Sequence, residues 1–109
     1  MSKEYTPDLQ KLFLEMMMQD AQNYVRVQNI FNVENFDRSL KDSAEFIKSH
    51  CTNHTAMPTY EQLNAATGVN AKPIPDMADG HNDWFLEEFE GFTRRQELER
   101  AILKAADML

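Results

Sequence analysis

Two histidines and the single cysteine of the chain stand close enough together to suggest a metal site. His50 and His54 are spaced i, i+4, so they share one face of a predicted helix, and Cys51 lies between them. Structural zinc takes four protein ligands, and catalytic zinc takes three with water. A fourth ligand would have to come from His81, beyond a proline-containing loop. We therefore expect no metal, and we assign Cys51 to the core.

The residue types that catalysis needs are present, but their spacing does not favour a catalytic site. Glu87, Glu88 and Glu90 form an acidic run in the first turns of a predicted helix, which is typical of a solvated face. General acid–base catalysis needs a carboxyl group whose pKa is raised by burial beside a cleft. The three glycines stand too far apart to form a phosphate-binding loop. We therefore expect no enzymatic activity and no cofactor.

The composition limits the kinds of partner. The 109 residues include 18 acidic and 11 basic side chains, so the formal net charge is -7. This charge argues against direct binding of DNA by neutralisation of phosphates. A lone cysteine fits a reducing cytoplasm, and no stretch approaches the ~20 apolar residues of a membrane span. We therefore expect a cytoplasmic domain that binds other proteins and no membrane.

Capping residues and hydrophobic spacing predict an all-α fold. Thr6 and Pro7 begin a helix over residues 7–18, along which apolar side chains recur at i, i+3, i+4 and i+7. Asp20 can cap a short second helix. A third helix is expected from about Asn35. One of its faces carries Phe36, Leu40, Ser43, Ala44, Ile47 and Cys51.

Three consecutive methionines occupy residues 16–18 of the first predicted helix. Adjacent helical positions point in different directions, so three in a row cannot all face one core. We expect Met16 and Met17 to fill the core and Met18 to be exposed, where a methionine suits adaptable contact with a partner.

A capping box gives the clearest local prediction. Thr59 is followed three residues later by Gln62, and Gly68 stands where a left-handed C-cap belongs. The spacing predicts a short helix between Thr59 and Gly68, with Leu63 and Ala66 directed inward.

The same region matches the first half of a helix-turn-helix motif. Its recognition helix would have to begin near Asn70 and enter the major groove of DNA. Pro73 and Pro75 would interrupt that helix, and the neighbouring acidic residues would face phosphates. Because only the first half of the motif is present, a helix-turn-helix DNA-binding regulator is kept as the second alternative function.

A long last helix follows the proline-containing loop and is expected from about Asn82 to Leu109. Two apolar lines run along it, and the second is rotated relative to the first. The first line is Phe85, Phe89 and Phe92, and the second is Leu98, Ile102, Ala105 and Leu109. Either the second half meets another chain, or the helix is kinked at Gly91 and wraps its own core. The chain thus divides into a helical globular domain, 1–80, and an arm, 81–109.

Five short segments carry a resemblance to a known family. They are residues 33–38 (VENFDR), 46–50 (FIKSH), 57–59 (MPT), 84–88 (WFLEE) and 93–96 (TRRQ). In this order they resemble the N-terminal domain of DnaB-type hexameric replicative DNA helicases, most closely the version in tailed phages. The resemblance covers nearly the whole chain, from about Leu9 to the end.

The resemblance implies a helical bundle followed by a helical hairpin, of which the long helix is the first arm. In this family such domains form a collar above the motor ring and contact primase or a loader. It therefore implies a non-catalytic oligomerisation and partner-docking domain that forms a dimer or a higher homo-oligomer. Its partners would be primase, a helicase loader or a helicase motor domain. Any ATPase activity would reside in a motor domain, which this chain does not contain.

The expected contact surface is the distal half of the long helix. Its residues are Arg94, Arg95, Leu98, Ile102, Leu103 and Leu109. The aliphatic side chains would be buried by the partner, and the charged side chains would set register and specificity. The chain is expected to be either a fragment of a longer helicase or a free-standing relative. A free-standing phage or mobile-element regulator that binds a replicative helicase is therefore the first alternative function.

Overall fold

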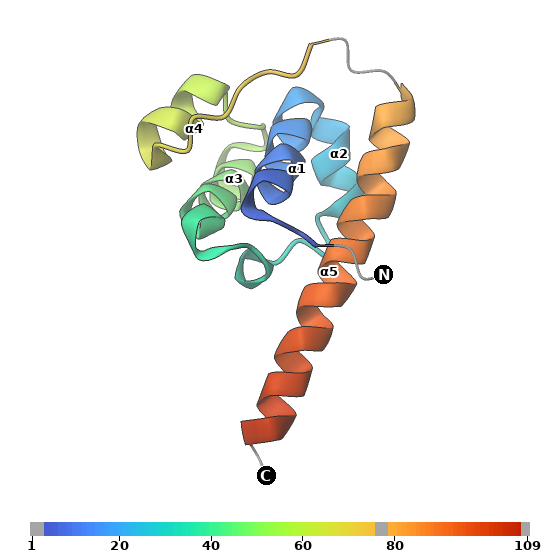
Figure 1. Ribbon diagram of the computed structural model, residues 1–109. Coiled ribbons are helices and arrows are strands. Elements are labelled where there is room, and N and C mark those ends of the chain that lie inside the picture. The colour runs from blue at the N-terminus through green and yellow to red at the C-terminus, as the bar shows by residue number, and fades with distance from the viewer. Residues whose placement is uncertain (1–3, 76–78, 108–109) are drawn as a thin grey trace.

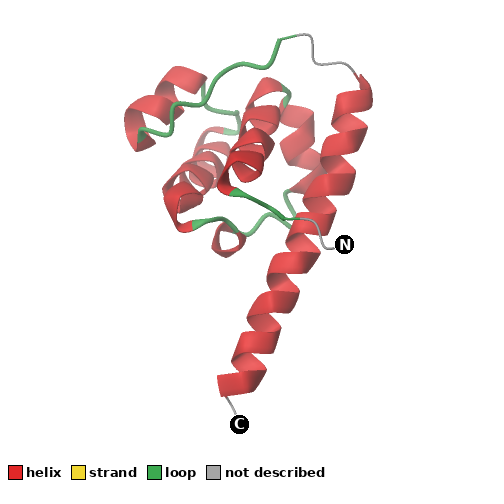
Figure 2. Ribbon diagram, viewed as in Figure 1, coloured by secondary structure: helices red, strands yellow, loops and turns green. Residues whose placement is uncertain are grey.

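The structure is a computed structural model that describes residues 4–75 and 79–107, and its regular elements are all helical within those ranges (Figures 1 and 2). The α-helices are α1 (Pro7–Gln19), α2 (Ala21–Val27), α3 (Lys41–His54), α4 (Tyr60–Thr67) and α5 (Asp79–Asp107). Two short 3-10 helices, η1 (Val33–Asn35) and η2 (Arg38–Leu40), connect α2 to α3. The predicted all-α fold with a long last helix is confirmed.

The expected caps begin the first two helices. The side-chain oxygen of Thr6 accepts a hydrogen bond from the backbone N–H of Leu9 at 3.2 Å. Asp20 accepts one from the backbone N–H of Gln22 at 3.0 Å and so separates α2 from α1. Each bond satisfies an N–H that the helix itself leaves unpaired.

Helix α4 has the predicted capping box. Thr59 and Gln62 exchange hydrogen bonds of 3.1 and 2.9 Å, and Gly68 ends the helix with a φ of 71°. Leu63 is fully buried, but Ala66 is exposed, so the expectation that both face inward is wrong for Ala66. A helix of eight residues that packs on one side presents only one narrow face to its neighbours.

The start of the third helix differs from the expectation, because α3 begins at Lys41 and not at Asn35. Two Asx caps divide the preceding residues into η1 and η2. Asn32 accepts from the backbone N–H of Glu34, and Asp37 accepts from that of Ser39, each at 3.0 Å. Such local bonds compete with helix propagation.

All three consecutive methionines are buried, so the expected exposure of Met18 is wrong: it is only 9% exposed. The reason is that α1 packs against both α2 and α5, and the loop that follows α4 covers a further side of it (Figure 1). That loop crosses α1, since the backbone N–H of Lys72 donates to Glu15 at 2.8 Å and that of Ile74 donates to Gln19 at 3.1 Å.

An aromatic cluster joins α1 to α5. Phe85, Phe89 and Phe92 of α5 are 0%, 1% and 0% exposed. The ring of Phe13, on α1, lies 6.0, 5.6 and 5.6 Å from theirs. Phe36 covers the end of the cluster, with its ring 5.3 Å from that of Phe92. The first apolar line of the long helix is therefore its core-facing line, as the spacing predicted.

Helix α5 is continuous over 29 residues, and its C-terminal half runs away from the other helices (Figure 1). Of the two alternatives for this helix, a kink at Gly91 that wraps it around its own core is therefore wrong. Because the three phenylalanines are core residues, the globular body includes the first half of α5, beyond the expected boundary at residue 80.

Within the described residues, no helix is both long and apolar enough to cross a membrane.

Candidate functional site

The last apolar side chains of α5 have no place in the core. Leu98, Ile102 and Leu103 are 59%, 57% and 66% exposed, and every residue from 101 to 107 is exposed. Single exposed leucines are ordinary on protein surfaces, but a contiguous apolar patch indicates an interaction site. The question is therefore whether these side chains share one face of the helix.

Successive helical residues are about 100° apart around the axis, which allows the faces of α5 to be compared. On this basis one face of roughly 140° contains only apolar side chains over residues 98–107. This face, called here the distal apolar face, consists of Leu98, Ala101, Ile102, Ala105 and Ala106. It is rotated by roughly 70–170° from the line of the three buried phenylalanines. The distal apolar face therefore points away from the direction in which α5 meets the body.

Not all the expected interface residues lie on this face. Leu98 and Ile102 form its centre. Leu103 lies about 100° further round and continues the phenylalanine line past the end of the body, so α5 does not bring it to the same face. Leu109 lies outside the described residues.

The two expected arginines border the distal apolar face on the side nearer the body. Arg94 is exposed, and Arg95 pairs with Glu99, with its Nε 3.0 Å from Oε1. Such an exposed i, i+4 pair contributes only a few tenths of a kcal/mol, ~0.3–0.5, to stability. These charges therefore add little to the stability of the fold.

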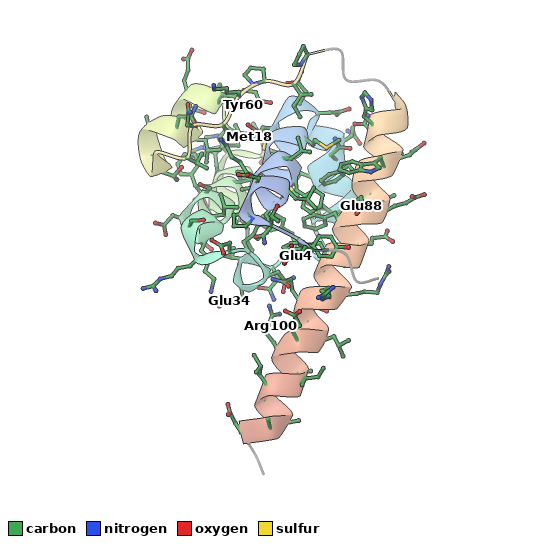
Figure 3. The ribbon with its side chains drawn as sticks, viewed as in Figure 1. Glu4, Met18, Glu34, Tyr60, Glu88 and Arg100 are labelled. Atoms are coloured by element: carbon green, nitrogen blue, oxygen red, sulfur yellow. The ribbon has the colours of Figure 1, made fainter. Side chains whose placement is uncertain are left out.

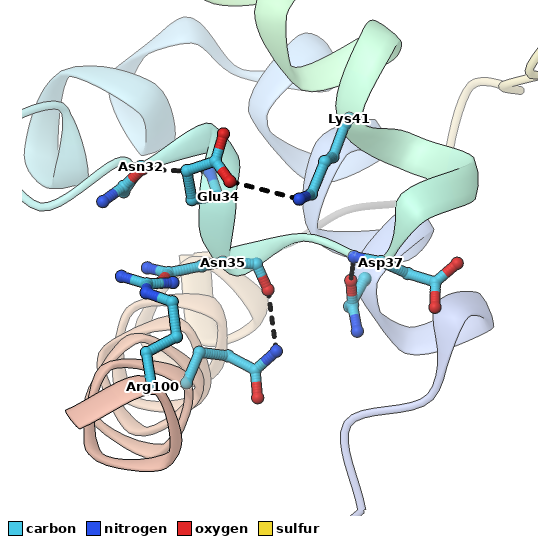
Figure 4. A network of polar contacts seen from close by, with 8 residues as sticks. Asn32, Glu34, Asn35, Asp37, Lys41 and Arg100 are labelled. Carbon is cyan, nitrogen blue, oxygen red and sulfur yellow. Dashed lines mark hydrogen bonds and ion pairs between the residues drawn. The ribbon is translucent and has the colours of Figure 1, made fainter. Parts of the chain in front are cut away.

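The point where α5 leaves the body is held by polar contacts that the sequence did not predict. Gln96 Nε2 donates to the backbone oxygen of Asn35 at 2.8 Å, and Arg100 Nη1 donates to its side-chain Oδ1 (Figure 4). Arg100 lies at the level where the helix parts from the other elements (Figure 3). One feature of the sequence could have indicated these contacts. Gln96 and Arg100 are spaced i, i+4 and continue the line of the three phenylalanines, which places them on the side of α5 that faces the body.

The histidine and cysteine side chains do not form a metal site in the described part of the chain. The rings of His50 and His54 lie 4.6 Å apart, but no group of three potential ligands converges within the described ranges. Cys51 is partly buried, and this burial raises the pKa of its thiol, which disfavours the thiolate that a metal would need. His81 instead lines an apolar hollow with residues of α1 and with Trp84.

The acidic run on α5 lies along the outside of the helix. Glu87 and Glu90 are exposed, and Glu88 is half-exposed. A nearby hollow of about 420 Å³, between α2 and the start of α5, is polar and is bridged by Arg26 and Asp83, whose charged atoms are 3.8 Å apart. Both side chains are largely exposed, so this pair joins the two helices only weakly.

The helix-turn-helix alternative lacks its second helix in the described region, because residues 68–75 are not helical. Asn64 holds Ala71 through two hydrogen bonds, one of 2.9 Å to its backbone oxygen and one of 2.7 Å from its N–H. Asn70 adopts a positive φ of 60°. These contacts hold the segment in a non-helical conformation beside α4, where the alternative needs a recognition helix.

No family model, curated protein or solved structure matches the chain. The distal apolar face is therefore the feature of the described residues that points most directly to a function. It combines exposed aliphatic side chains, small alanines that permit close approach of another helix, and bordering arginines.

Proposed function

We propose that the chain is a non-catalytic oligomerisation and partner-docking domain of a DnaB-type replicative DNA helicase. The observation that carries the proposal is the distal apolar face, which stands exposed on a helix whose other half is built into the core. Burial of one large aliphatic side chain contributes about 1.5–3 kcal/mol. Leu98 and Ile102 therefore provide a driving force for helix–helix docking.

The resemblance supplies the identity of the larger assembly. Its five segments follow one another in the order that the family shows, and the all-α fold with a long last helix agrees with what the family implies. In such a collar the arm would pair with a second copy, and primase or a helicase loader would dock on the assembly. DNA would be left to the motor domain, in keeping with the net charge of -7.

Light scattering on the purified chain tests the docking surface. We expect the unmodified chain to self-associate or to bind the motor domain or primase, and the double variant Leu98→Asp, Ile102→Asp to do neither. Thermal unfolding should be nearly unchanged in that variant, because both positions are exposed.

Leu103→Asp is the control, and the single variant Ile102→Asp is its match in charge. Leu103→Asp places one negative charge next to Ile102 but about 100° further round the helix, so it should associate like the unmodified chain, whereas Ile102→Asp should not. If the unmodified chain is monomeric at high concentration and binds neither motor domain nor primase, the docking function is wrong.

The nature of the partner separates the leading proposal from its first alternative. If the reading frame continues past Leu109 into a Walker loop, the chain is the collar of that helicase. If a separate replicative helicase captures the purified chain, and the capture depends on Leu98 and Ile102, the free-standing regulator is favoured.

A further inference from the structure

Asn35 lies in the globular body and contacts the half of α5 that leaves it, residues 94–107. It is 1% exposed and accepts two hydrogen bonds from α5, one on its backbone oxygen from Gln96 at 2.8 Å and one on its side-chain oxygen from Arg100. Gln96 and Arg100 are four residues apart, so they reach Asn35 from the same face of α5. Figure 4 shows Asn35 above the long helix, with the side chain of Arg100 directed towards it. We call these three residues the polar clamp.

The polar clamp acts where hydrophobic packing of α5 has ended. Phe92 and Thr93 are the last described residues of α5 that are buried. The remaining stretch, 94–107, is about as short as the ~12–15 residues at which an isolated helix is marginal in water. Without a contact to the body, its last turns would fray.

The body offers the clamp a rigid base. Asn35 ends η1, which Asn32 caps and which Lys41 braces through an ion pair of 3.2 Å with Glu34. The next residue, Phe36, is packed on the aromatic cluster. Because the core fixes the position of Asn35, hydrogen bonds to Asn35 also restrain α5.

The clamp also accounts for a polar side chain in a buried place. Among the described residues, Nδ2 of Asn35 has no hydrogen-bond partner, and an unsatisfied buried amide group costs about 1–3 kcal/mol. An aliphatic side chain would avoid this cost, but it would leave the guanidinium of Arg100 without its acceptor.

We propose that Asn35 is a positioning residue for the distal apolar face: through Gln96 and Arg100 it keeps residues 94–107 helical before any partner binds. Its consequence for docking rests on the proposed function, because a partner that needs the formed helix binds more weakly when only a fraction of the molecules have it. The clamp itself is a property of the free chain and can be tested without a partner.

Amide hydrogen exchange on the free, full-length chain tests the clamp. In Asn35→Ala we expect residues 97–107 to exchange about tenfold faster, which is the loss expected for a hydrogen bond to a charged group. Exchange in α3 should stay unchanged. Asn35→Asp keeps an acceptor for Arg100 and should restore slow exchange, which a general loss of packing at this position would not do.

Two further variants keep the test decisive. If Asn35→Ala does not fold, Arg100→Leu removes the same hydrogen bond from the half-exposed side and should give the same increase. Glu99→Ala, the matched control, breaks only the exposed pair with Arg95 and should change exchange less than about twofold. Unchanged exchange in Arg100→Leu, or exchange in Asn35→Asp as fast as in Asn35→Ala, would overturn the inference.

The clamp and the proposed function fail in different ways. If the clamp variants show faster exchange but the unmodified chain binds no partner, the positioning role stands and the docking function is wrong. If the partner binds equally well to the unmodified chain and to Arg100→Leu, despite faster exchange, both the clamp and docking stand, and only the inferred consequence of the clamp for docking is wrong.

Discussion

The two halves of α5 meet different surroundings although they belong to one uninterrupted helix. From Asp79 to Thr93 the helix directs phenylalanines into a closed aromatic core, whereas from Arg94 to Asp107 its aliphatic side chains lie in solvent. The distal apolar face is also rotated away from the phenylalanine line. Even an extended body on the same side would therefore leave this face exposed.

The comparison shows that an apolar stripe on a helix can either pack within its own domain or remain exposed. The first stripe stabilises the domain because α1 lies against it, and the second stabilises nothing within the described chain. A change of phase between two stripes on one helix thus indicates a change of partner. On this division the proximal half of α5 carries the stability of the domain and the distal half does not.

The largest effect is expected for Phe89→Ala. Phe89 is buried, with its ring 5.6 Å from that of Phe13 and 6.2 Å from that of Phe31, so its loss leaves a cavity. Such substitutions cost about 3–5 kcal/mol, measured as the free energy of unfolding in urea. Leu98→Ala, on the distal half, should change it by less than about 0.5 kcal/mol. Equal losses in the two variants would contradict the division.

A buried polar contact at the start of α5 should matter less than the rings but more than the exposed charges. Asn23 Nδ2 donates to the backbone oxygen of Met16 and to Oδ1 of Asn82, each at 3.0 Å. Asn23→Ala removes both hydrogen bonds and should cost about 1–3 kcal/mol in urea unfolding. The exposed pair of Arg95 and Glu99 serves as the comparison, and a similar cost for Glu99→Ala would count against this ranking.

The free energy of unfolding should depend on pH through Tyr60, which lies in the globular body. Tyr60 Oη donates to the backbone oxygen of Glu15 at 3.1 Å, and burial, with Glu15 as the second cause, raises the pKa of Tyr60 to about 12 from 10.0. Because folding raises this pKa, the stabilising contribution of the neutral phenol is complete below pH 10 and is lost as the pH rises towards about 12.

The matched variant for this pH effect is Tyr60→Phe. It should lose about 0.5–1.5 kcal/mol at neutral pH and should lack the part of the alkaline decline that Tyr60 causes. Urea unfolding at neutral pH and near pH 11 measures both quantities. An alkaline decline of the same size in both proteins would show that Tyr60 does not cause it.

The smallest effect is expected at Gly91, between the two halves. Alanine favours a helix by about 0.8–1 kcal/mol over glycine, but the new Cβ would lie 2.7 Å from the hydroxyl oxygen of Tyr5, whose ring would have to shift. We expect Gly91→Ala to change the free energy of unfolding by less than about 1 kcal/mol. In a Tyr5→Ala background the same change should stabilise by close to the full propensity difference. A loss above about 2 kcal/mol would show that Tyr5 cannot move.

Local structure was predictable where the signal lies within a few residues. The caps at Thr6, Asp20 and Thr59 and the left-handed Gly68 follow from hydrogen bonds between near neighbours, and the structure has all four. The spacing does not predict the late start of α3, because the caps at Asn32 and Asp37 compete with a helix of correct hydrophobic spacing.

The spacing of apolar residues predicts which face of a helix is buried, but it does not predict what covers the other faces. The spacing of the three phenylalanines indicated the core line of α5, but the burial of Met18 depends on what surrounds α1 on its other sides. Similarly, Leu103 was assigned to the contact surface because it is aliphatic, and only its angle relative to the body separates it from Ile102.

The helical class, most helix boundaries and the change of phase along α5 are predictable from the sequence, because each depends on residues less than two turns apart. Three other features depend on the tertiary structure: which stripe is covered, where α5 leaves the body, and the contact of Asn35 with Gln96 and Arg100. These contacts join residues about sixty positions apart in the chain, and no local spacing specifies them.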